Sequence, residues 1–254
     1  MKLGAQFFTL RDFCKTPDEL AESLKKVADI GYTSVQISGT CAYEPEWLAA
    51  ELKKNGLTCD LTHVPLSSFT DDPAKTAADH KIFGCKYIGL GMGPNGISTD
   101  PDLDKMVEIV KGAAPAFKQA GALFMYHNHA GEFAKCSNGN YRLWELACRT
   151  EPEELGFTLD SFWVQHGGAD LIETYKLFKG RMPCVHFKDY TMANINEVRM
   201  APVGRGNLNF EKLVAVCEDG GTEFIFVEQD NCYGEDPFKC LAESYAYLRS
   251  LGLN

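Results

Sequence analysis

The stretch "LFMYHNHAGEF" at residues 123–133 is an apolar run that ends abruptly in polar side chains. His127, Asn128 and His129 follow the apolar residues directly, and Glu132 comes three residues later. Polar side chains at the end of a buried strand cost free energy unless they bind something. Because side chains alternate along a strand, His127 and His129 face the same side. The stretch therefore predicts part of a binding site.

Three further apolar runs, later in the chain, carry polar side chains at the same point. Taken singly, an Asp before a helix is more often a cap, and a lone His is more often a structural residue held by hydrogen bonds. Four such strand ends in succession would require four independent coincidences, which favours a shared function. The residues concerned are Asp160, His186, Lys188, Asp189, Glu228, Gln229 and Asp230.

These residue types favour a divalent cation as the partner. Carboxylates with imidazoles and no thiolate suit Mn²⁺, Zn²⁺, Fe²⁺, Co²⁺ or Mg²⁺. Asp160, His186 and Glu228 are the predicted core ligands. The fourth ligand is His127 or Glu132, and His127 is preferred because it lies on the strand whereas Glu132 follows in the loop.

The segments that would position these residues alternate between strand and helix along the whole chain. Eight apolar strands joined by crossover helices predict a parallel sheet covered by helices. The expected strands are 3–10, 34–38, 58–64, 87–91, 123–129, 156–160, 183–189 and 224–230, and the expected helices are 16–31, 44–56, 72–84, 100–121, 139–150, 168–180, 208–221 and 236–252.

Eight such units in 254 residues predict an α/β fold of the (β/α)8, or TIM, barrel type, in a single domain over residues 1–254. A doubly wound open sheet is the alternative, but "TLRDF" stands where its glycine-rich fingerprint would follow the first strand. No linker or repeat divides the chain. In a barrel the carboxyl ends of the strands surround one mouth, so the polar strand ends would meet there.

The amino-acid composition and net charge limit the kinds of molecule that the protein is expected to bind. The net charge of −10, from 25 basic and 35 acidic residues, opposes binding to nucleic acid. The ten cysteines form no CxxC pair, and their scattered spacing predicts small core residues in a reducing cytoplasm. The start of the chain lacks the features of a signal peptide, and no apolar run approaches about 18 residues, so no membrane span is expected. A cytoplasmic protein with a small-molecule partner is predicted, and assembly into a homo-oligomer is compatible with these features.

With these residues in place, the chain resembles the xylose isomerase-like barrel family, the sugar phosphate isomerases and epimerases. That family includes tagatose and psicose epimerases, hydroxypyruvate isomerase and inosose dehydratases. The resemblance covers essentially the whole chain. It rests on "YHNH..EF" at 126–133, "LDSFWVQHGGAD" at 159–170, "VHFKD" at 185–189, "VGRGNLNF" at 203–210 and "VEQD" at 227–230.

The resemblance implies a metal held by strands five to eight, with Asp160, His186 and Glu228 on the matching ligand positions. The first ligand of the epimerases is a Glu, and His127 stands there instead. In the epimerases the first and last Glu are paired acid/base groups. The change to His127 therefore makes two-base epimerisation less certain and one-base elimination more plausible. Inosose dehydratases, and related enzymes that cleave 3-keto glycosides, carry out such eliminations. A metal-free site is a further alternative.

The resemblance thus implies a metal-dependent sugar isomerase or epimerase that abstracts a proton next to a carbonyl and passes through an enediolate. A lyase or dehydratase acting on a keto-sugar, keto-glycoside or keto-inositol is the alternative, ahead of a phosphodiesterase or a silent sugar-binding barrel. His129 or His127 would be the base, with Glu228 on the other face. Lys188 would stabilise the oxyanion or pair with Asp189.

Five further residues are expected to contact the substrate. They are Gln6, Arg11, Gln36 and His63, as contacts to hydroxyl groups, and Trp163, as a surface that stacks on the sugar. A phosphate site near Arg199 and Arg205 is the less favoured interpretation of "VRMAPVGRGN". Gly204 and Gly206 are instead expected to shape a tight loop, which favours a sugar without phosphate.

Overall fold

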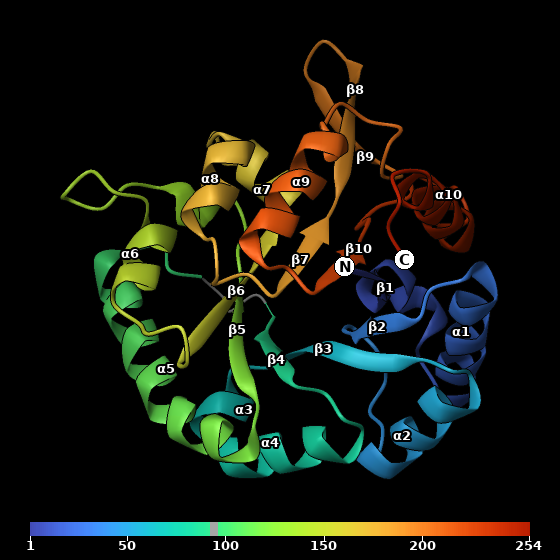
Figure 1. Ribbon diagram of the computed structural model, residues 1–254, viewed down its shortest axis with the longest axis horizontal. Helices are drawn as coiled ribbons and strands as arrows, with labels where there is room; N and C mark the ends of the chain where they lie inside the picture. The colour runs from blue at the N-terminus through green and yellow to red at the C-terminus, as the bar shows by residue number, and fades with distance from the viewer. Residues whose placement is uncertain (92–95) are drawn as a thin grey trace.

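A computed structural model describes residues 1–91 and 96–254 of the chain. Within them, parallel strands close into a barrel in the order β1-β10-β7-β6-β5-β4-β3-β2, and helices surround it (Figure 1). The predicted (β/α)8 barrel is confirmed. The barrel strands are β1 (Lys2–Gln6), β2 (Ser34–Ile37), β3 (Thr58–Val64), β4 (Tyr87–Leu90), β5 (Leu123–His127), β6 (Leu155–Asp160), β7 (Cys184–Phe187) and β10 (Phe224–Val227).

The main helices begin and end where local sequence signals place them. Thr16 and Glu19 form a capping box at the start of α1, and Gly31 ends that helix at φ 120°. No helix of the described residues is long and apolar enough to cross a membrane. The main helices are α1 (Pro17–Ile30), α2 (Pro45–Lys54), α4 (Pro73–Ile82), α5 (Asp100–Ala120), α6 (Arg142–Cys148), α8 (Leu171–Leu177), α9 (Phe210–Gly220) and α10 (Pro237–Ser250), with short α3 (Ser67–Thr70) and α7 (Ser161–His166).

Two apolar layers hold the barrel together. The larger core lies between the strands and the surrounding helices, and a smaller cluster fills the barrel interior. The interior cluster is Leu61, Tyr87, Met125, Cys184, Phe224 and Phe226. A Cβ on Gly4 would lie 2.5 Å from the ring of Phe226, so only glycine fits beside that ring. These side chains fill the amino-terminal half of the barrel, which leaves the carboxyl-terminal mouth for polar groups.

The first strand is shorter than the expected 3–10. It ends at Gln6, and residues Phe7–Phe13 form a 3-10 helix, η1. The side chain of Gln6 caps this helix, because its Oε1 accepts a hydrogen bond of 2.7 Å from the N–H of Phe8. Propensity alone suggested that "FFTL" continues the strand, and this cap instead turns the chain over the barrel mouth.

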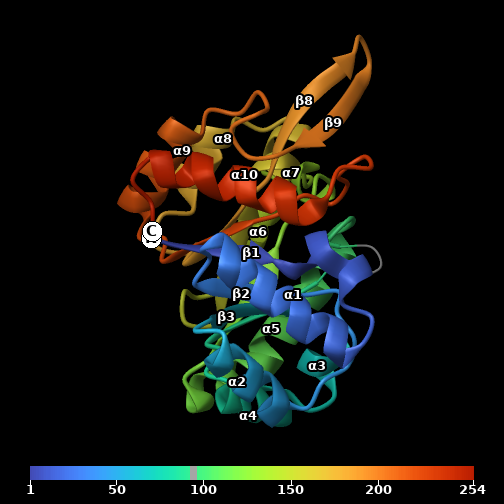
Figure 2. The same cartoon turned by 90° about the vertical axis from the view of Figure 1, so that its right-hand side faces the viewer.

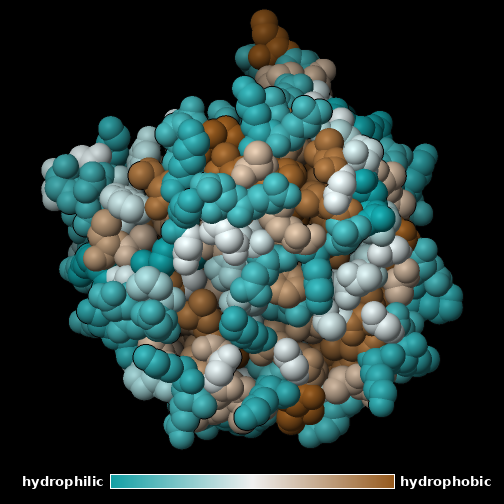
Figure 3. Space-filling model, viewed as in Figure 1, coloured by the Kyte–Doolittle hydropathy of each residue, from teal (hydrophilic) through white to brown (hydrophobic). Residues whose placement is uncertain are grey.

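A hairpin that the sequence did not predict follows the seventh barrel strand. β8 (Asp189–Asn194) and β9 (Glu197–Ala201) pair antiparallel and project from the barrel (Figure 2). Ile195 at the turn is 91% exposed. Figure 3 shows a hydrophobic tip where this hairpin protrudes from a largely hydrophilic surface.

The buried carboxylate of Asp189 fastens the hairpin to the barrel. It accepts hydrogen bonds from the backbone N–H groups of Tyr190 (2.8 Å), Gly204 (3.0 Å), Gly206 (2.8 Å) and Leu208 (3.2 Å). A Cβ on Gly206 would collide with the Asp189 carboxylate and the backbone of Tyr190. The expected loop-shaping role of Gly204 and Gly206 is confirmed, because their N–H groups already bind a carboxylate.

Replacing Asp189 tests this anchor. Asp189→Ala should lower the free energy of unfolding by about 2–3 kcal/mol, because four backbone donors lose their acceptor. Urea unfolding followed by circular dichroism measures the change. Asp189→Asn is the matched control, since it keeps one acceptor oxygen and should lose less. Wild-type stability of the alanine variant would contradict the anchor.

Candidate active site

A cavity of about 530 Å³, hereafter the mouth cavity, lies at the carboxyl ends of the barrel strands. Seven of the residues predicted to carry chemistry or bind substrate line it. They are Gln6, His63, His127, His129, Trp163, Lys188 and Glu228. Residues from distant parts of the sequence therefore meet at one place, as the barrel topology requires.

Four side chains form a buried cluster at the floor of this mouth. Each offers one ligand atom, and these atoms all lie within 4.8 Å of one another. His186 Nδ1 lies 3.0 Å from Glu228 Oε2 and 3.6 Å from Asp160 Oδ2, and His127 Nε2 lies 3.3 Å from the same Asp160 oxygen. We call these four residues, His127, Asp160, His186 and Glu228, the ligand cluster.

Strand register accounts for the cluster. Asp160 is paired with His186 across β6 and β7, so their side chains start side by side. Asp160 also performs the structural role that a residue before a helix often has. Its Oδ1 accepts a hydrogen bond of 3.0 Å from Trp163 N at the start of α7, while its Oδ2 faces the cluster. The capping and functional interpretations of Asp160 are therefore compatible.

The donor set of the ligand cluster fits a divalent cation. Two imidazoles and two carboxylates are ligands for Zn²⁺, Mn²⁺, Fe²⁺ or Co²⁺. Among the described residues, His186 Nδ1 is buried and forms no hydrogen bond, although it lies 3.0 Å from Glu228 Oε2, an oxygen that Lys188 Nζ also contacts at 3.0 Å. Buried polar atoms of this kind need a partner, and a cation between them would supply it.

The protonation states of Asp160, Glu228 and His127 suit a cation. By contrast, burial would lower the pKa of His186, but Glu228 and Asp160 raise it. Burial alone would raise the pKa values of Asp160 and Glu228, but Lys188 and the neighbouring histidines hold both pKa values well below their usual range. Burial, with repulsion from His186, lowers the pKa of His127 to about 3. At neutral pH the two carboxylates are therefore ionised and His127 is neutral.

Lys188 is a buried cation among three carboxylates. Its Nζ lies 3.1 Å from Asp160 Oδ2, 3.0 Å from Glu228 Oε2 and 3.1 Å from Asp230 Oδ1. The suggested pairing of Lys188 with Asp189 was wrong, because backbone N–H groups occupy that carboxylate. Lys188 thus belongs to the floor of the mouth cavity.

Gln36, expected to contact substrate, lies behind the ligand cluster. It is fully buried and does not line the mouth cavity. Its Oε1 lies 2.6 Å from His186 Nε2. Accepting the Nε2 proton there leaves His186 Nδ1 directed at the carboxylates, which is the orientation a metal-binding imidazole needs. In this structure Gln36 orients His186.

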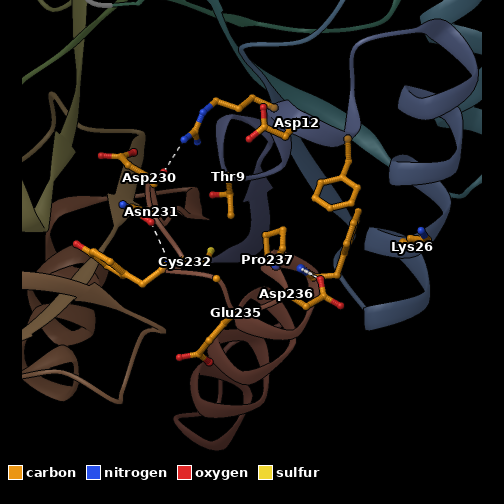
Figure 4. A pocket seen from close by; sticks show the side chains of 14 residues that line it. Thr9, Asp12, Lys26, Asp230, Asn231, Cys232, Glu235, Asp236 and Pro237 are labelled. Atoms are coloured by element: carbon orange, nitrogen blue, oxygen red, sulfur yellow. Dashed lines mark hydrogen bonds between the residues drawn. The ribbon is translucent and has the colours of Figure 1, made fainter.

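Arg11, also expected at the substrate, lines a different cavity of about 570 Å³, the side cavity (Figure 4). Its guanidinium donates hydrogen bonds of 2.8 Å to the backbone carbonyls of Phe8 and Asp230, and it stacks on the Phe8 ring. Arg11 therefore ties the loop after β10 to η1. Asp230 lines both cavities and separates them.

Glu132, the alternative fourth ligand, has other partners. It accepts hydrogen bonds from Tyr126 Oη (2.9 Å) and His129 N (3.0 Å), and it is not part of the ligand cluster. These bonds fix the chain directly after β5. Asn128 has a similar role, because its Oδ1 accepts a hydrogen bond of 3.1 Å from Asp160 N.

The sequence analysis named Asp230 among the polar strand ends without giving it a specific role and did not name Ser38, and both line the mouth cavity. Burial, with repulsion from Glu228, raises the pKa of Asp230 to about 7. Ser38 Oγ lies 3.4 Å from His63 Nδ1. The "VEQD" motif signalled Asp230, whereas no sequence pattern pointed to Ser38.

Removing one cluster residue tests the metal site. His186→Ala should abolish binding of a divalent cation, because it removes a central ligand atom from a set of four. Elemental mass spectrometry after reconstitution and desalting measures metal per chain. His166→Ala, a change at an exposed histidine on α7, is the control and should keep the wild-type metal content. Full metal content in His186→Ala would refute the ligand assignment.

The role of Gln36 is tested separately. Gln36→Leu should weaken metal binding by about 10- to 100-fold, because His186 loses the acceptor that fixes its tautomer. Gln36→Glu keeps an acceptor at this position and should bind metal at least as tightly as the wild type. Isothermal titration with Mn²⁺ compares the three proteins, and equal affinity in Gln36→Leu would exclude the orienting role.

Comparisons with known proteins agree with this architecture. The chain is 24% identical over 227 residues to an inosose dehydratase of Geobacillus kaustophilus, covering 80% of this chain and 72% of the relative. It is 23% identical over 271 residues to an inosose dehydratase of Mesomycoplasma hyopneumoniae, covering 91% and 88%.

Among solved structures, a sugar phosphate isomerase/epimerase of Parabacteroides distasonis superposes with a TM-score of 0.82 at 22% identity, covering 98% of this chain and 93% of that one. An L-ribulose 3-epimerase superposes with a TM-score of 0.74 at 14% identity, covering 99% and 94%. These likenesses show the shared fold. A family model described as "Xylose isomerase-like TIM barrel" matches residues 24–251, and the chain belongs to this family.

Proposed function

We propose that this protein is a metal-dependent enzyme that abstracts a proton next to the carbonyl of a sugar or related polyhydroxy compound and isomerises or epimerises it through an enediolate. The observation that carries the proposal is the ligand cluster at the floor of the mouth cavity. Perturbed ionisable groups gathered in a cleft are typical of catalytic sites.

His129 is the proposed base. It lines the mouth cavity but is not part of the ligand cluster, so its imidazole is free for the substrate. Burial lowers its pKa below the ordinary value, so the ring is neutral at pH 7 and can accept a proton. His129 is adjacent to His127 and Trp163, at ring-centroid distances of 4.7 and 5.2 Å.

A divalent cation held by the ligand cluster would stabilise the negative charge that develops on the substrate oxygens. Glu228 is the proposed group on the other face of the substrate. Gln6 donates a hydrogen bond of 3.1 Å to Glu228 Oε1 and so fixes the direction of this carboxylate. Lys188, beside Glu228 and Asp160, adds positive charge near the same oxygens.

Two unpartnered polar atoms support a substrate rich in hydroxyl groups. His63 Nε2 and Trp163 Nε1 are buried, have no hydrogen-bond partner within residues 1–91 and 96–254, and belong to residues that line the mouth cavity. The basic residues that would recognise a phosphate are occupied elsewhere. Arg205 pairs with Glu235 and Glu243, and Arg199 pairs with Glu197. A small sugar without phosphate is therefore the proposed substrate.

Dehydration is the second candidate reaction. His127 stands where the epimerases have a Glu, so only one carboxylate of their acid/base pair is present. The relatives named inosose dehydratase in the comparisons favour the same alternative. His129 would abstract the proton and then return it to the neighbouring hydroxyl, which leaves as water, so a single base would be enough and the first step would be the same as in isomerisation.

Proton exchange with solvent tests the shared step. Incubation of ketoses and keto-inositols with the metal-loaded protein in deuterated water should incorporate deuterium next to the carbonyl. Mass spectrometry then separates the two candidates, because isomerisation conserves the formula whereas dehydration removes water. His129→Ala should slow exchange by at least about 100-fold, since it removes the base. The exposed-histidine variant His166→Ala should exchange like the wild type. Wild-type exchange in His129→Ala would rule out His129 as the base.

A further inference from the structure

The Lys188 ammonium contacts two carboxylate oxygens of residues that would hold the proposed metal ion. Lys188 Nζ lies 3.1 Å from Asp160 Oδ2 and 3.0 Å from Glu228 Oε2. The same two oxygens face the imidazole of His186, at 3.6 and 3.0 Å from Nδ1. They are thus the carboxylate oxygens closest to the proposed ligand nitrogen. A divalent cation bound among them would lie next to the ammonium.

Two cations on the same oxygens repel each other strongly where water is excluded. Lys188 is 1% exposed, and Asp160 is fully buried. Water therefore screens little of this repulsion. Without a metal, the ammonium reduces the repulsion between the two carboxylates and keeps the cluster compact.

Asp230 offers the ammonium a second partner outside the ligand cluster. Both of its carboxylate oxygens lie 3.1 Å from Lys188 Nζ. Asp230 is not a member of the ligand cluster, and its side chain is 25% exposed. When all three carboxylates around the lysine are ionised, the net charge of the group is −2, which a divalent cation would balance.

We propose that Lys188 is an internal competitor of the metal ion, bound to Asp160 and Glu228 in the metal-free protein and held by Asp230 when the metal is bound. This inference rests on the proposed metal site and adds to it a residue pair that sets metal affinity. Lys188 lowers the affinity by occupying ligand oxygens. Asp230 raises it by accepting the displaced ammonium.

Calorimetric titration of Mn²⁺ into the chelator-treated full-length protein tests the pair. Lys188→Met removes the competing charge at similar length and should bind Mn²⁺ at least about tenfold more tightly than the wild type. Lys188→Arg keeps the charge and should not gain affinity. Lys179→Met, at an exposed lysine paired with Asp219, is the control for a general change of net charge and should bind like the wild type.

A double-mutant cycle tests the role of Asp230 without relying on the lysine variant alone. Asp230→Asn should weaken Mn²⁺ binding by about tenfold in the wild-type background and by less than about threefold in Lys188→Met. If Asp230→Asn weakens Mn²⁺ binding equally in both backgrounds, Asp230 acts only through its charge, and its proposed pairing with the displaced Lys188 is overturned. If Lys188→Met does not fold, unchanged affinity in Asp230→Asn alone overturns the proposal.

The outcomes separate this inference from the proposed function. If the wild type binds Mn²⁺ and Lys188→Met binds it equally or more weakly, the inference fails and the metal site stands. Binding by Lys188→Met but not by the wild type supports competition by the lysine. If neither protein binds Mn²⁺, the inference fails, and deuterium exchange by the wild type then decides the proposed function independently.

Discussion

The contacts of the Lys188 ammonium with Asp160 and Glu228 are the interaction on which the site depends. Burying charged groups costs several kcal/mol for each ion unless partners are close. Here the partners come from the ends of three neighbouring barrel strands. The register of β6 and β7, which pairs Asp160 with His186, brings them within reach. Gln6 and Gln36 then hold the side chains of Glu228 and His186 by hydrogen bonds, and Asn128 holds the backbone N–H of Asp160.

The barrel could be predicted from the sequence because eight apolar runs alternate with amphipathic segments. The ligand cluster could also be predicted, because parallel strands bring their carboxyl ends to one mouth. The directions in which the side chains of Gln36 and Arg11 point could not be predicted. Each forms a hydrogen bond with a group far away in the sequence, at separations of 150 and 219 residues. The hairpin was missed because its anchor, Asp189, binds N–H groups that become adjacent only in the folded chain.

The family and the reaction are separate questions for this chain. The matched family, and superposition with epimerases and isomerases at 14–22% identity, account for the barrel. The chemistry depends on a few side chains at its mouth. His127 is neutral at pH 7, so the ligand cluster carries one negative charge less than a set with Glu in that position. Compared with a set that has Glu at this position, such a set would attract a divalent cation less by charge and would hold it more through bonds from its nitrogen atoms.

The first and last barrel strands, β1 and β10, pair with each other, and their carboxyl ends lie beside the site, whereas the chain termini lie close together in Figure 1 and Figure 2. Gln6 reaches Glu228 across 222 residues, and Arg11 reaches the carbonyl of Asp230 across 219. These contacts close loops that span most of the chain, which makes them late to form during folding. The complete set of charged groups therefore exists only after β10 has docked against β1. A nascent or partly unfolded chain has no assembled site, so assembly of the site reports closure of the whole barrel.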